Sequence, residues 1–286
     1  MEYFGPVTVV EYEFIGLVLM GTAVAFFLIA LPVYALIRHL FPEKGWHLGG
    51  GVSVSGIELT DLVVAGGFMI LYGVSWKLLP ETVAKQDVNE MTATAIISGS
   101  IAVLMIAMVV PLVLFWRVNL LEFFGLRWEG WRKVLWIAPC FVVSMLALGF
   151  LMQVLGWQDW VNGHFGAKEQ KMVQLMKETP DVGILIAIAF GAVVIAPVAE
   201  EVIFRGYLYP VAKRYSDGWF AALFTGVLFG VIHFNVMGLP LLAVMGVVLV
   251  VLYERTGSLW VSIACHGLFN AAQVINMLVM RFSENS

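Results

Sequence analysis

The sequence has few charged residues, and this scarcity decides its class. Only 13% of its 286 residues are charged, whereas 61% are hydrophobic. A soluble domain carries roughly 25% charged residues, and its folded surface needs polar cover that this chain cannot supply. Lipid is the natural surrounding of such a surface. We therefore expect an integral, multi-pass membrane protein, located in the plasma (inner) membrane.

Basic residues and cysteines are scarce as well. The formal net charge is −4, so nothing attracts a nucleic acid and no such partner is expected. The two cysteines, Cys140 and Cys265, lie inside long apolar runs, which argues against a disulfide framework. The first residues include Glu2, Glu11 and Glu13 rather than basic residues. A signal peptide is therefore not predicted, and the first apolar run is interpreted as a retained span.

Long apolar runs are abundant, and they set the fold class. A helix needs about 20 apolar residues to cross the hydrocarbon core, and eight segments approach that length. They are Phe14–Ile37, Leu62–Leu79, Met91–Trp116, Val134–Leu155, Val182–Phe204, Trp219–Phe234, Leu239–Tyr253 and Leu259–Met280. The strands of a membrane barrel would alternate over about 10 residues, and these continuous runs do not alternate. We predict an all-α polytopic membrane protein with about eight transmembrane helices.

The eight segments divide into two groups of four. Residues 1–180 contain the first four spans and a hydrophilic stretch, Gly156–Asp181, that connects the groups. Within this stretch, Ala167 to Lys177 is either an amphipathic helix at the membrane interface or a solvated loop. Residues 181–286 contain the other four spans, and we expect them to form the functional core.

Ionisable side chains mark that core, because burying them in a bilayer is costly and usually serves function. Glu200 and Glu201 lie in the fifth segment, His233 lies near the end of the sixth, and His266 lies inside the eighth. The first four spans hold almost none. Three spans within 67 residues of sequence therefore each carry an ionisable group, which predicts a shared site.

The fifth segment pairs one glutamate with an arginine and leaves its neighbour free. Glu201 and Arg205 are four residues apart on one helix face, in the order that favours an ion pair. Glu200 points about 100° away around the helix, so it is free to act. Pro197 lacks an N–H and loosens the helix one turn earlier, which suits a segment that lines a cavity.

The sixth and eighth segments carry the histidines in similar settings. Phe229 precedes His233 by four residues, so its ring can pack beneath the imidazole and fix its rotamer. Asn270 follows His266 by four residues, so both can donate hydrogen bonds toward one point. Two convergent donors can stabilise a developing oxyanion.

Glu200 and His233 would lie near opposite membrane surfaces if segments five and six were straight antiparallel spans. They can meet if segment five continues as a helix to about Tyr209, which places Glu200 deeper. We expect this continuation, because Gly206 is the only residue that weakens the helix before Pro210.

The three patterns together resemble the signatures of the CPBP (CAAX protease and bacteriocin-processing, or ABI) family of intramembrane proteases, which includes the type II CAAX prenyl endopeptidases. In this sequence they are Glu200-Glu201-x-x-x-Arg205, Phe229-x-x-x-His233 and His266-x-x-x-Asn270. The resemblance covers roughly residues 180–275, and every motif position is filled. It implies about eight helices around a conical intramembrane cavity. It also implies hydrolysis of a peptide bond in a membrane-associated protein or peptide, with prenylated CAAX proteins among the substrates.

The resemblance also implies a role for each motif residue. Glu200 would be the general base that activates water, and His233 would help to position that water. His266 and Asn270 would stabilise the oxyanion. Glu201, Arg205 and Phe229 would support the site, and no cofactor or metal is expected.

Two alternatives remain open from the residues themselves. Glu200, His233 and His266 form a two-histidine, one-glutamate set of a kind that zinc accepts, which would make the protein a zinc-dependent intramembrane metalloprotease. Asn270 on the face of His266 favours a pair of oxyanion donors over a metal ligand backed by a carboxylate. The polar residues could instead line a path in a non-enzymatic transporter or scaffold. The nearly apolar first half disfavours a transporter.

Overall fold

The computed structural model describes residues 47–78, 103–165 without 128 and 129, and 179–284 without 234, together with Met176 and scattered positions between 18 and 45. Every regular element in these ranges is helical, which confirms the all-α prediction. The elements are α2 (Leu59–Leu78), the apolar helix Val103–Leu114, α4 (Leu120–Phe123), η2 (Trp131–Lys133), α5 (Val134–Val154), α6 (Trp157–Phe165), α8 (Val182–Phe190), η3 (Gly191–Ile195), α9 (Ala196–Ile203), η4 (Phe204–Leu208), α10 (Tyr209–Tyr215), α11 (Gly218–Val231), α12 (Leu239–Thr256) and α13 (Leu259–Glu284).

Four of these helical stretches are long and apolar enough to cross a membrane. They are Trp131–Val154, Val182–Tyr215, Leu239–Thr256 and Leu259–Ser283. Three further predicted segments are overlapped by shorter apolar helices, Leu59–Phe68, Val103–Leu114 and Gly218–Val231. The chain is therefore an integral membrane protein, as predicted. The first predicted span, Phe14–Ile37, lies mostly outside the described residues, so the number of eight spans stays a prediction.

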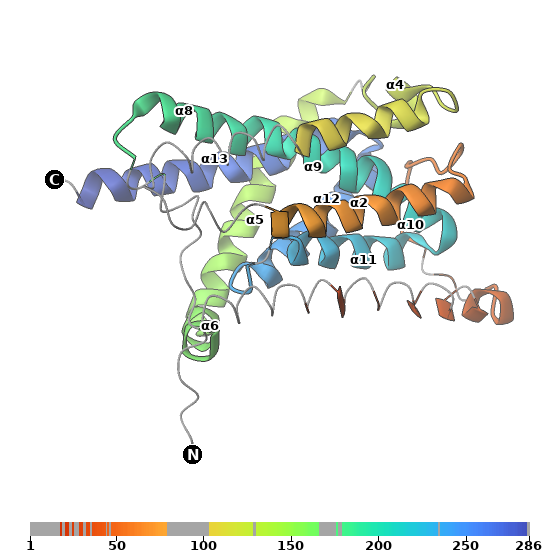
Figure 1. Cartoon of the computed structure of the whole chain (residues 1–286), viewed down its shortest axis with the longest axis horizontal. Helices are drawn as coiled ribbons and strands as arrows, with labels where there is room; N and C mark the ends of the chain where they lie inside the picture. Colours follow the sequence, from red (N-terminus) through yellow and green to blue (C-terminus); the bar gives the residue numbers. More distant parts are fainter. Residues whose placement is uncertain are drawn as a thin grey trace, which may run out of the picture.

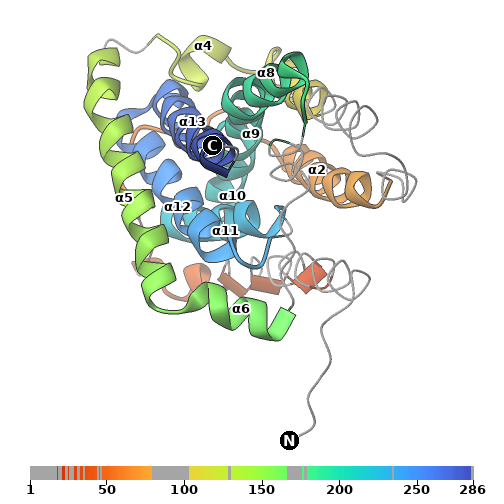
Figure 2. The same cartoon turned by 90° about the vertical axis from the view of Figure 1, so that its left-hand side faces the viewer.

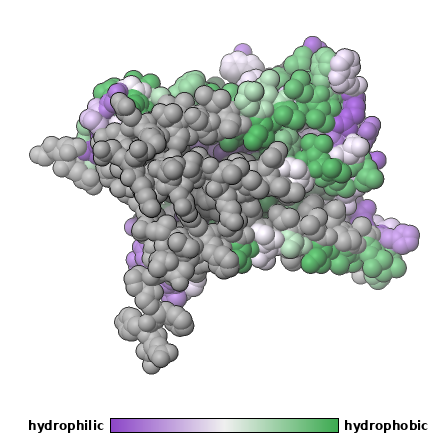
Figure 3. Space-filling model, in the orientation of Figure 1, coloured by the Kyte–Doolittle hydropathy of each residue, from purple (hydrophilic) through white to green (hydrophobic). Residues whose placement is uncertain are grey.

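Most of the helices run along the long axis of the molecule, and one runs across them. α2, α8, α11 and α13 follow that axis in Figure 1. Seen along the axis, α11, α12 and α13 lie between α5 on one side and α2 on the other (Figure 2). α5 runs across this bundle in both views and packs against α13. Large parts of the outer surface are hydrophobic, as a lipid-facing surface requires (Figure 3).

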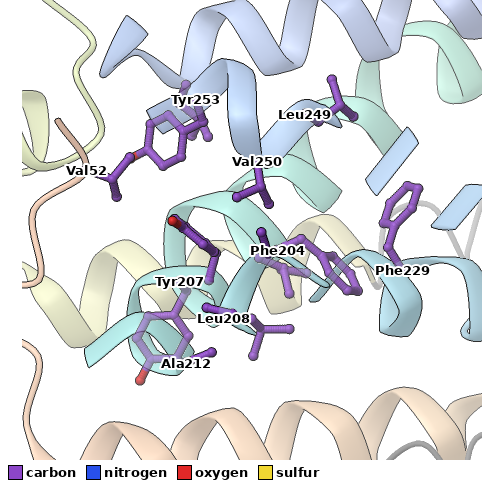
Figure 4. Packing of buried hydrophobic residues seen from close by; sticks show 14 of the residues in the cluster. Val52, Phe204, Tyr207, Leu208, Ala212, Phe229, Leu249, Val250 and Tyr253 are labelled. Carbon is purple, nitrogen blue, oxygen red and sulfur yellow. The ribbon is translucent and has the colours of Figure 1, made fainter. Parts of the chain in front are cut away.

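One hydrophobic core contains buried side chains from both groups of helices. Val110 and Phe141 from the first group belong to the same cluster as Phe204 and Leu249 from the second. Figure 4 shows the part of this core in which Phe204, on the long helix that begins at α8, lies among the neighbouring helices that carry Leu249 and Phe229. The division predicted between residues 180 and 181 stays a prediction.

The long helix Val182–Tyr215 is continuous but contains two π-helical segments, η3 and η4. The helix passes Tyr209 and ends at Tyr215, which confirms the expected continuation. Each π segment is followed, two residues after its end, by a proline: Pro197 after η3 and Pro210 after η4. Pro197, the residue that we expected to loosen the helix, therefore lies beside the first irregularity.

The hydrophilic connection between the two groups begins with a helix that we did not predict. α6 forms because Trp157, Val161 and Phe165 recur at helical spacing, and Val161 is fully buried. The indole N–H of Trp157 donates to the carbonyl oxygen of Met237 over 2.8 Å, which ties α6 to the loop after α11. The interfacial helix predicted over Ala167 to Lys177 lies outside the described residues, apart from Met176.

Candidate active site

Glu201 forms the centre of a buried ionic network. Its Oε1 atom accepts a hydrogen bond from Arg205 over 2.7 Å and lies 2.9 Å from Nδ1 of His266. The Arg205 guanidinium also donates to the carbonyl oxygen of Gly246 in α12 over 3.2 Å. The i,i+4 pair predicted from the sequence is confirmed, and it also reaches α13 through His266. Glu201 therefore links three helices that carry or contact the site.

Glu200 has a different environment, although it is the next residue. It is largely buried, and its Oε2 atom has no hydrogen-bond partner. This atom lies 3.9 Å from Nε2 of His233 and 3.9 Å from Nε2 of His266. Three side chains from α9, the end of α11 and α13 therefore converge on one point, as the positions of the ionisable groups predicted.

In both histidines, Nδ1 faces a hydrogen-bond acceptor on the side of the ring away from Glu200. Nδ1 of His233 is 2.7 Å from the carbonyl oxygen of Phe229, and Nδ1 of His266 faces the carboxylate of Glu201. A carbonyl and an ionised carboxylate only accept hydrogen bonds, so each Nδ1 carries a hydrogen. In a neutral imidazole, Nε2 is then a free acceptor. In a protonated imidazole Nε2 is instead a donor, so each Nε2 atom is available in one of these roles to a group held beside Glu200.

Phe229 packs between the charged and the titratable groups. Its ring centroid is 4.8 Å from that of His233 and 5.6 Å from that of His266. The Arg205 guanidinium carbon lies 4.5 Å from the same centroid, in cation–π geometry. Phe229 is fully buried, so its ring contacts both imidazoles and the Arg205 guanidinium out of reach of solvent. The expected packing of Phe229 against His233 is confirmed.

Asn270 is directed elsewhere. Its Nδ2 atom donates to the carbonyl oxygen of Ala192, in η3, over 2.8 Å. The structure thus brings Glu200, His233 and His266 together and supports them with Glu201 and Arg205, whereas it commits one amide hydrogen of Asn270 to the backbone. The role of Asn270 as an oxyanion donor stays a prediction.

One argument made from the sequence is wrong. We expected His266 to lack a carboxylate behind it, because Asn270 on the same face suits a pair of oxyanion donors better than a carboxylate-backed ligand. Oε1 of Glu201 contacts both Arg205 and Nδ1 of His266. A single carboxylate oxygen has two lone pairs and can accept from both. The spacing of four residues predicted the first partner and contained no signal for the second.

Comparison with known proteins gives one family and one curated relative. Residues 182–272, from α8 into α13, match the family described as type II CAAX prenyl endopeptidase Rce1-like. The chain is also 25% identical over 146 residues to the "Putative membrane peptidase YdiL" of Bacillus subtilis (strain 168). This alignment covers 51% of the chain and 57% of the relative, so the chain spans little more than half of that protein's length. No solved structure matches the chain.

The matched segment coincides with the elements that build the site. Glu200, Glu201 and Arg205 lie on the long helix, His233 follows α11, and His266 lies in α13, all within residues 182–272. The matching family is described as an endopeptidase and the relative is named a membrane peptidase, and this chain has apolar helices that can cross a membrane. Over residues 182–272 the chain is therefore similar to the type II CAAX prenyl endopeptidases of the CPBP family, as its three motifs predicted.

Proposed function

We propose that the protein is an intramembrane endopeptidase in which Glu200 activates a water molecule to hydrolyse a peptide bond. The observation that carries this proposal is the environment of one atom. Oε2 of Glu200 is buried without a hydrogen-bond partner, and it lies 3.9 Å from Nε2 of both His233 and His266. A buried carboxylate oxygen left unpaired indicates a position for a water or a substrate group.

The separations suit a shared water molecule. A water oxygen can lie about 2.8 Å from two atoms that are 3.9 Å apart, so one water can bond Glu200 and an imidazole together. The water donates one hydrogen to the carboxylate and one to a free Nε2 atom. His233 is the partner that we assign to this water, because it comes from the end of α11 and is more exposed than His266.

The reaction then needs only these side chains. The water oxygen attacks the carbonyl carbon of the substrate while its proton moves to Glu200. The carbonyl oxygen becomes an oxyanion, which protonated His266 binds through its Nε2–H. The carboxylate of Glu201 behind Nδ1 stabilises that charged imidazole. Glu200 returns the proton to the amide nitrogen as the C–N bond breaks, which releases an amine and a carboxylic acid.

The substrate that we propose is a membrane-associated protein or peptide. A site among apolar helices accepts a segment that partitions into lipid, and water-soluble peptides would rarely reach it. The matching family is described as a CAAX prenyl endopeptidase, so a farnesylated peptide with a CAAX end is the first probe to use. The bilayer is the other partner, and we expect the plasma (inner) membrane.

A comparison of cells tests the proposal even while the substrate is unidentified. Membrane peptides are quantified in cells that produce the wild type, the Glu200→Gln variant or the matched control Glu122→Gln, whose side chain is exposed in α4. We expect a set of membrane proteins to stay untrimmed only with Glu200→Gln. Identical peptides in all three cells, and no cleavage of the farnesylated probe, would contradict the proposal and favour a transporter or scaffold.

A zinc-dependent mechanism is the second candidate, and one observation favours it. Each histidine donates from Nδ1 to an oxygen acceptor and turns Nε2 toward Glu200, as zinc-ligating histidines commonly do. The separations of 3.9 Å are wider than the roughly 3.3 Å between neighbouring ligands of tetrahedral zinc. Within the ranges that the structure describes, no group of three such side chains has the spacing of a metal site.

Metal removal distinguishes the two mechanisms. We expect turnover of the farnesylated probe to survive exhaustive treatment with a strong zinc chelator, because Glu200 can activate water unaided. Elemental analysis of the same protein serves as the control for complete removal. Activity that disappears and returns with one equivalent of zinc per chain would establish the metalloprotease instead.

A further inference from the structure

The first π segment leaves a backbone carbonyl without its helical donor. The N–H of Ala196 bonds the carbonyl oxygen of Gly191, five residues back, rather than that of Ala192. The next N–H along the chain would belong to residue 197, which is proline and has none. The carbonyl oxygen of Ala192 therefore has no partner within its own helix.

An unpaired carbonyl is costly at this place. The helix Val182–Tyr215 is apolar enough to cross a membrane, and no water reaches the hydrocarbon core to replace a missing backbone partner. Nδ2 of Asn270 fills the position, donating to the carbonyl oxygen of Ala192 over 2.8 Å. Asn270 lies on α13, so the bond joins two transmembrane helices.

A second contact packs α13 against the same π segment, η3. Val193 is the residue whose carbonyl oxygen would pair with residue 197 in a regular helix, so Pro197 removes its donor too. Gly267, three residues before Asn270, packs against this carbonyl so closely that a Cβ atom there would lie 2.9 Å from it. α13 thus contacts the two neighbouring carbonyl groups, of Ala192 and Val193, either of which an N–H at residue 197 could bond.

We propose that Asn270 is a positioning residue. Its hydrogen bond holds α13 against the π segment η3, just before Pro197, and thereby sets the distance between His266 and Glu200. His266 lies one turn before Asn270 on α13, and Glu200 lies three residues after Pro197 on the long helix. The fixed bond therefore holds the two reacting groups in register. The catalytic consequence rests on the proposed function, whereas the fastening itself does not.

If the hydrogen bond of Asn270 has this role, Pro197→Ala should compensate for the loss of Asn270. Replacing Pro197 by alanine returns an N–H that can bond the carbonyl oxygen of Ala192 or Val193, so the amide of Asn270 is no longer needed there. Loss of Asn270 should therefore matter in the wild type and matter little in the Pro197→Ala background. An asparagine that acts only as an oxyanion donor would be needed equally in both backgrounds.

The second π segment supplies the matched control. The N–H of Tyr209 bonds the carbonyl oxygen of Phe204, five residues back, and Pro210 follows directly. Pro210→Ala changes a proline of the same helix in the same backbone setting, but far from Asn270. Gln273→Ala, three residues after Asn270 on α13, controls for the loss of an amide side chain.

The experiment is a double-mutant cycle on the purified full chain in lipid nanodiscs. Melting temperature and hydrogen exchange of residues 192–199 are measured for Asn270→Ala in the wild-type, Pro197→Ala and Pro210→Ala backgrounds. We expect Asn270→Ala to lower the melting temperature by several degrees and to accelerate exchange over residues 192–199. We expect the effect to persist with Pro210→Ala, to vanish with Pro197→Ala and to be absent in Gln273→Ala.

Turnover of the farnesylated probe gives the catalytic readout. Asn270→Ala should lower kcat by up to about 10²-fold, as a misplacement of roughly 1 Å can, with little change in KM. In the Pro197→Ala background the same change should alter kcat by no more than about twofold, the margin within which independent sites add. Exchange and melting do not require activity, so they test the fastening even if the probe is not cleaved.

Three outcomes would overturn the inference. They are equal losses with and without Pro197, no change in melting or exchange on losing Asn270, and rescue by Pro210→Ala as well as by Pro197→Ala. If the Pro197→Ala variant does not fold, the inference is tested by comparing hydrogen exchange in the Asn270→Ala variant with that in the Gln273→Ala variant. Acceleration over residues 192–199 in the first variant alone supports the fastening, and its absence contradicts it.

Discussion

The long helix carries or contacts buried carboxylates in two regions, and these carboxylates are hydrogen-bonded to different degrees. Before Arg205, Oε2 atoms of both Glu200 and Glu201 lack hydrogen-bond partners. After Arg205, Tyr207 and Tyr209 donate to the carboxylates of Asp61 and Glu254, over 2.6 Å and 2.5 Å respectively. These two carboxylates have a partner for every oxygen.

The satisfied region joins the first group of helices to the second. Asp61, at the start of α2, accepts two hydrogen bonds from Arg117 and one from the backbone N–H of Glu58. The hydrogen bonds between Arg117 and Asp61 raise the pKa of the Arg117 guanidinium above its ordinary value. Glu254, at the end of α12, accepts from Lys213 and from the backbone N–H of Val52.

The difference in hydrogen bonding suits the proposed division between a reacting region and a structural one. A buried carboxylate with every oxygen paired contributes order and cannot bind a further molecule without losing a bond. One with an unpaired oxygen is costly unless a water or substrate group completes it. We therefore expect substitutions in the unsatisfied region to change turnover, and those in the satisfied region to change the free energy of unfolding.

The largest effect should come from Glu200→Gln. Turnover of the farnesylated probe should fall about 10²–10⁴-fold, the usual contribution of a general base. The melting temperature should hardly change, because Oε2 has no partner to lose. Kinetics and thermal unfolding in nanodiscs measure both quantities. A variant that keeps more than a tenth of the activity would contradict the role of Glu200 as the general base.

Glu201→Gln should combine both kinds of loss. It leaves the buried guanidinium of Arg205 without its counter-charge, which costs about 3–5 kcal/mol of unfolding free energy. It also weakens the acceptor behind His266, so kcat should drop beyond the loss of folded protein. Normalising kcat to the folded fraction separates the loss of turnover from the loss of folded protein. An unchanged melting temperature would contradict the role of Glu201 as the counter-charge of Arg205.

Asp61→Asn should lower stability without a direct effect on the reaction. We expect a cost of about 3 kcal/mol, the lower end of the range for breaking a buried pair, because the Arg117 side chain is 19% exposed. The turnover of the folded fraction should stay within a few-fold of the wild type. Asp159→Asn, an exposed change in α6, is the control. A pure loss of kcat would place Asp61 in the site.

Glu254→Gln should have the smallest of these effects. Glutamine still accepts from Tyr209, and Lys213 is 22% exposed and can reach water. The cost should be about 1.5–3 kcal/mol, the value of a hydrogen bond to a charged group. Chemical unfolding against Arg255→Gln, an exposed change on the next residue, checks this. A larger cost than that of Asp61→Asn would reverse the order within the satisfied region.

Sequence spacing predicted contacts within one helix and much of the convergence between helices. The pair Glu201–Arg205 and the packing of Phe229 beneath His233 follow from a spacing of four residues. The scarcity of ionisable groups in lipid predicted that Glu200, His233 and His266 would meet. These inferences need only helix geometry and the cost of burying charge.

Contacts that depend on irregular backbone or on distant packing were missed. Nothing in the motif around Asn270 shows that its partner is the carbonyl of Ala192, because the π segment is not visible in residue spacing. Asp61 and Arg117 lie at the edges of apolar runs, where charges are expected to be solvated, so their buried pairing gave no signal. The bond from Trp157 to Met237 depends on α6, a helix that we did not predict within the hydrophilic stretch.

The length of the long helix fixes how deep Glu200 lies. An α-helix rises 1.5 Å per residue, so the backbone from Glu200 to Lys213 spans about 20 Å. If the helix stands upright with Lys213 at one boundary of a hydrocarbon core about 30 Å thick, Glu200 would lie about 10 Å below the opposite boundary. An extended peptide advances roughly 3.3 Å per residue, so about three residues of a chain entering from that side reach the carboxylate. If the proposed hydrolysis takes place at Glu200, the length of this helix would limit how far from its own free end a substrate chain can be cut.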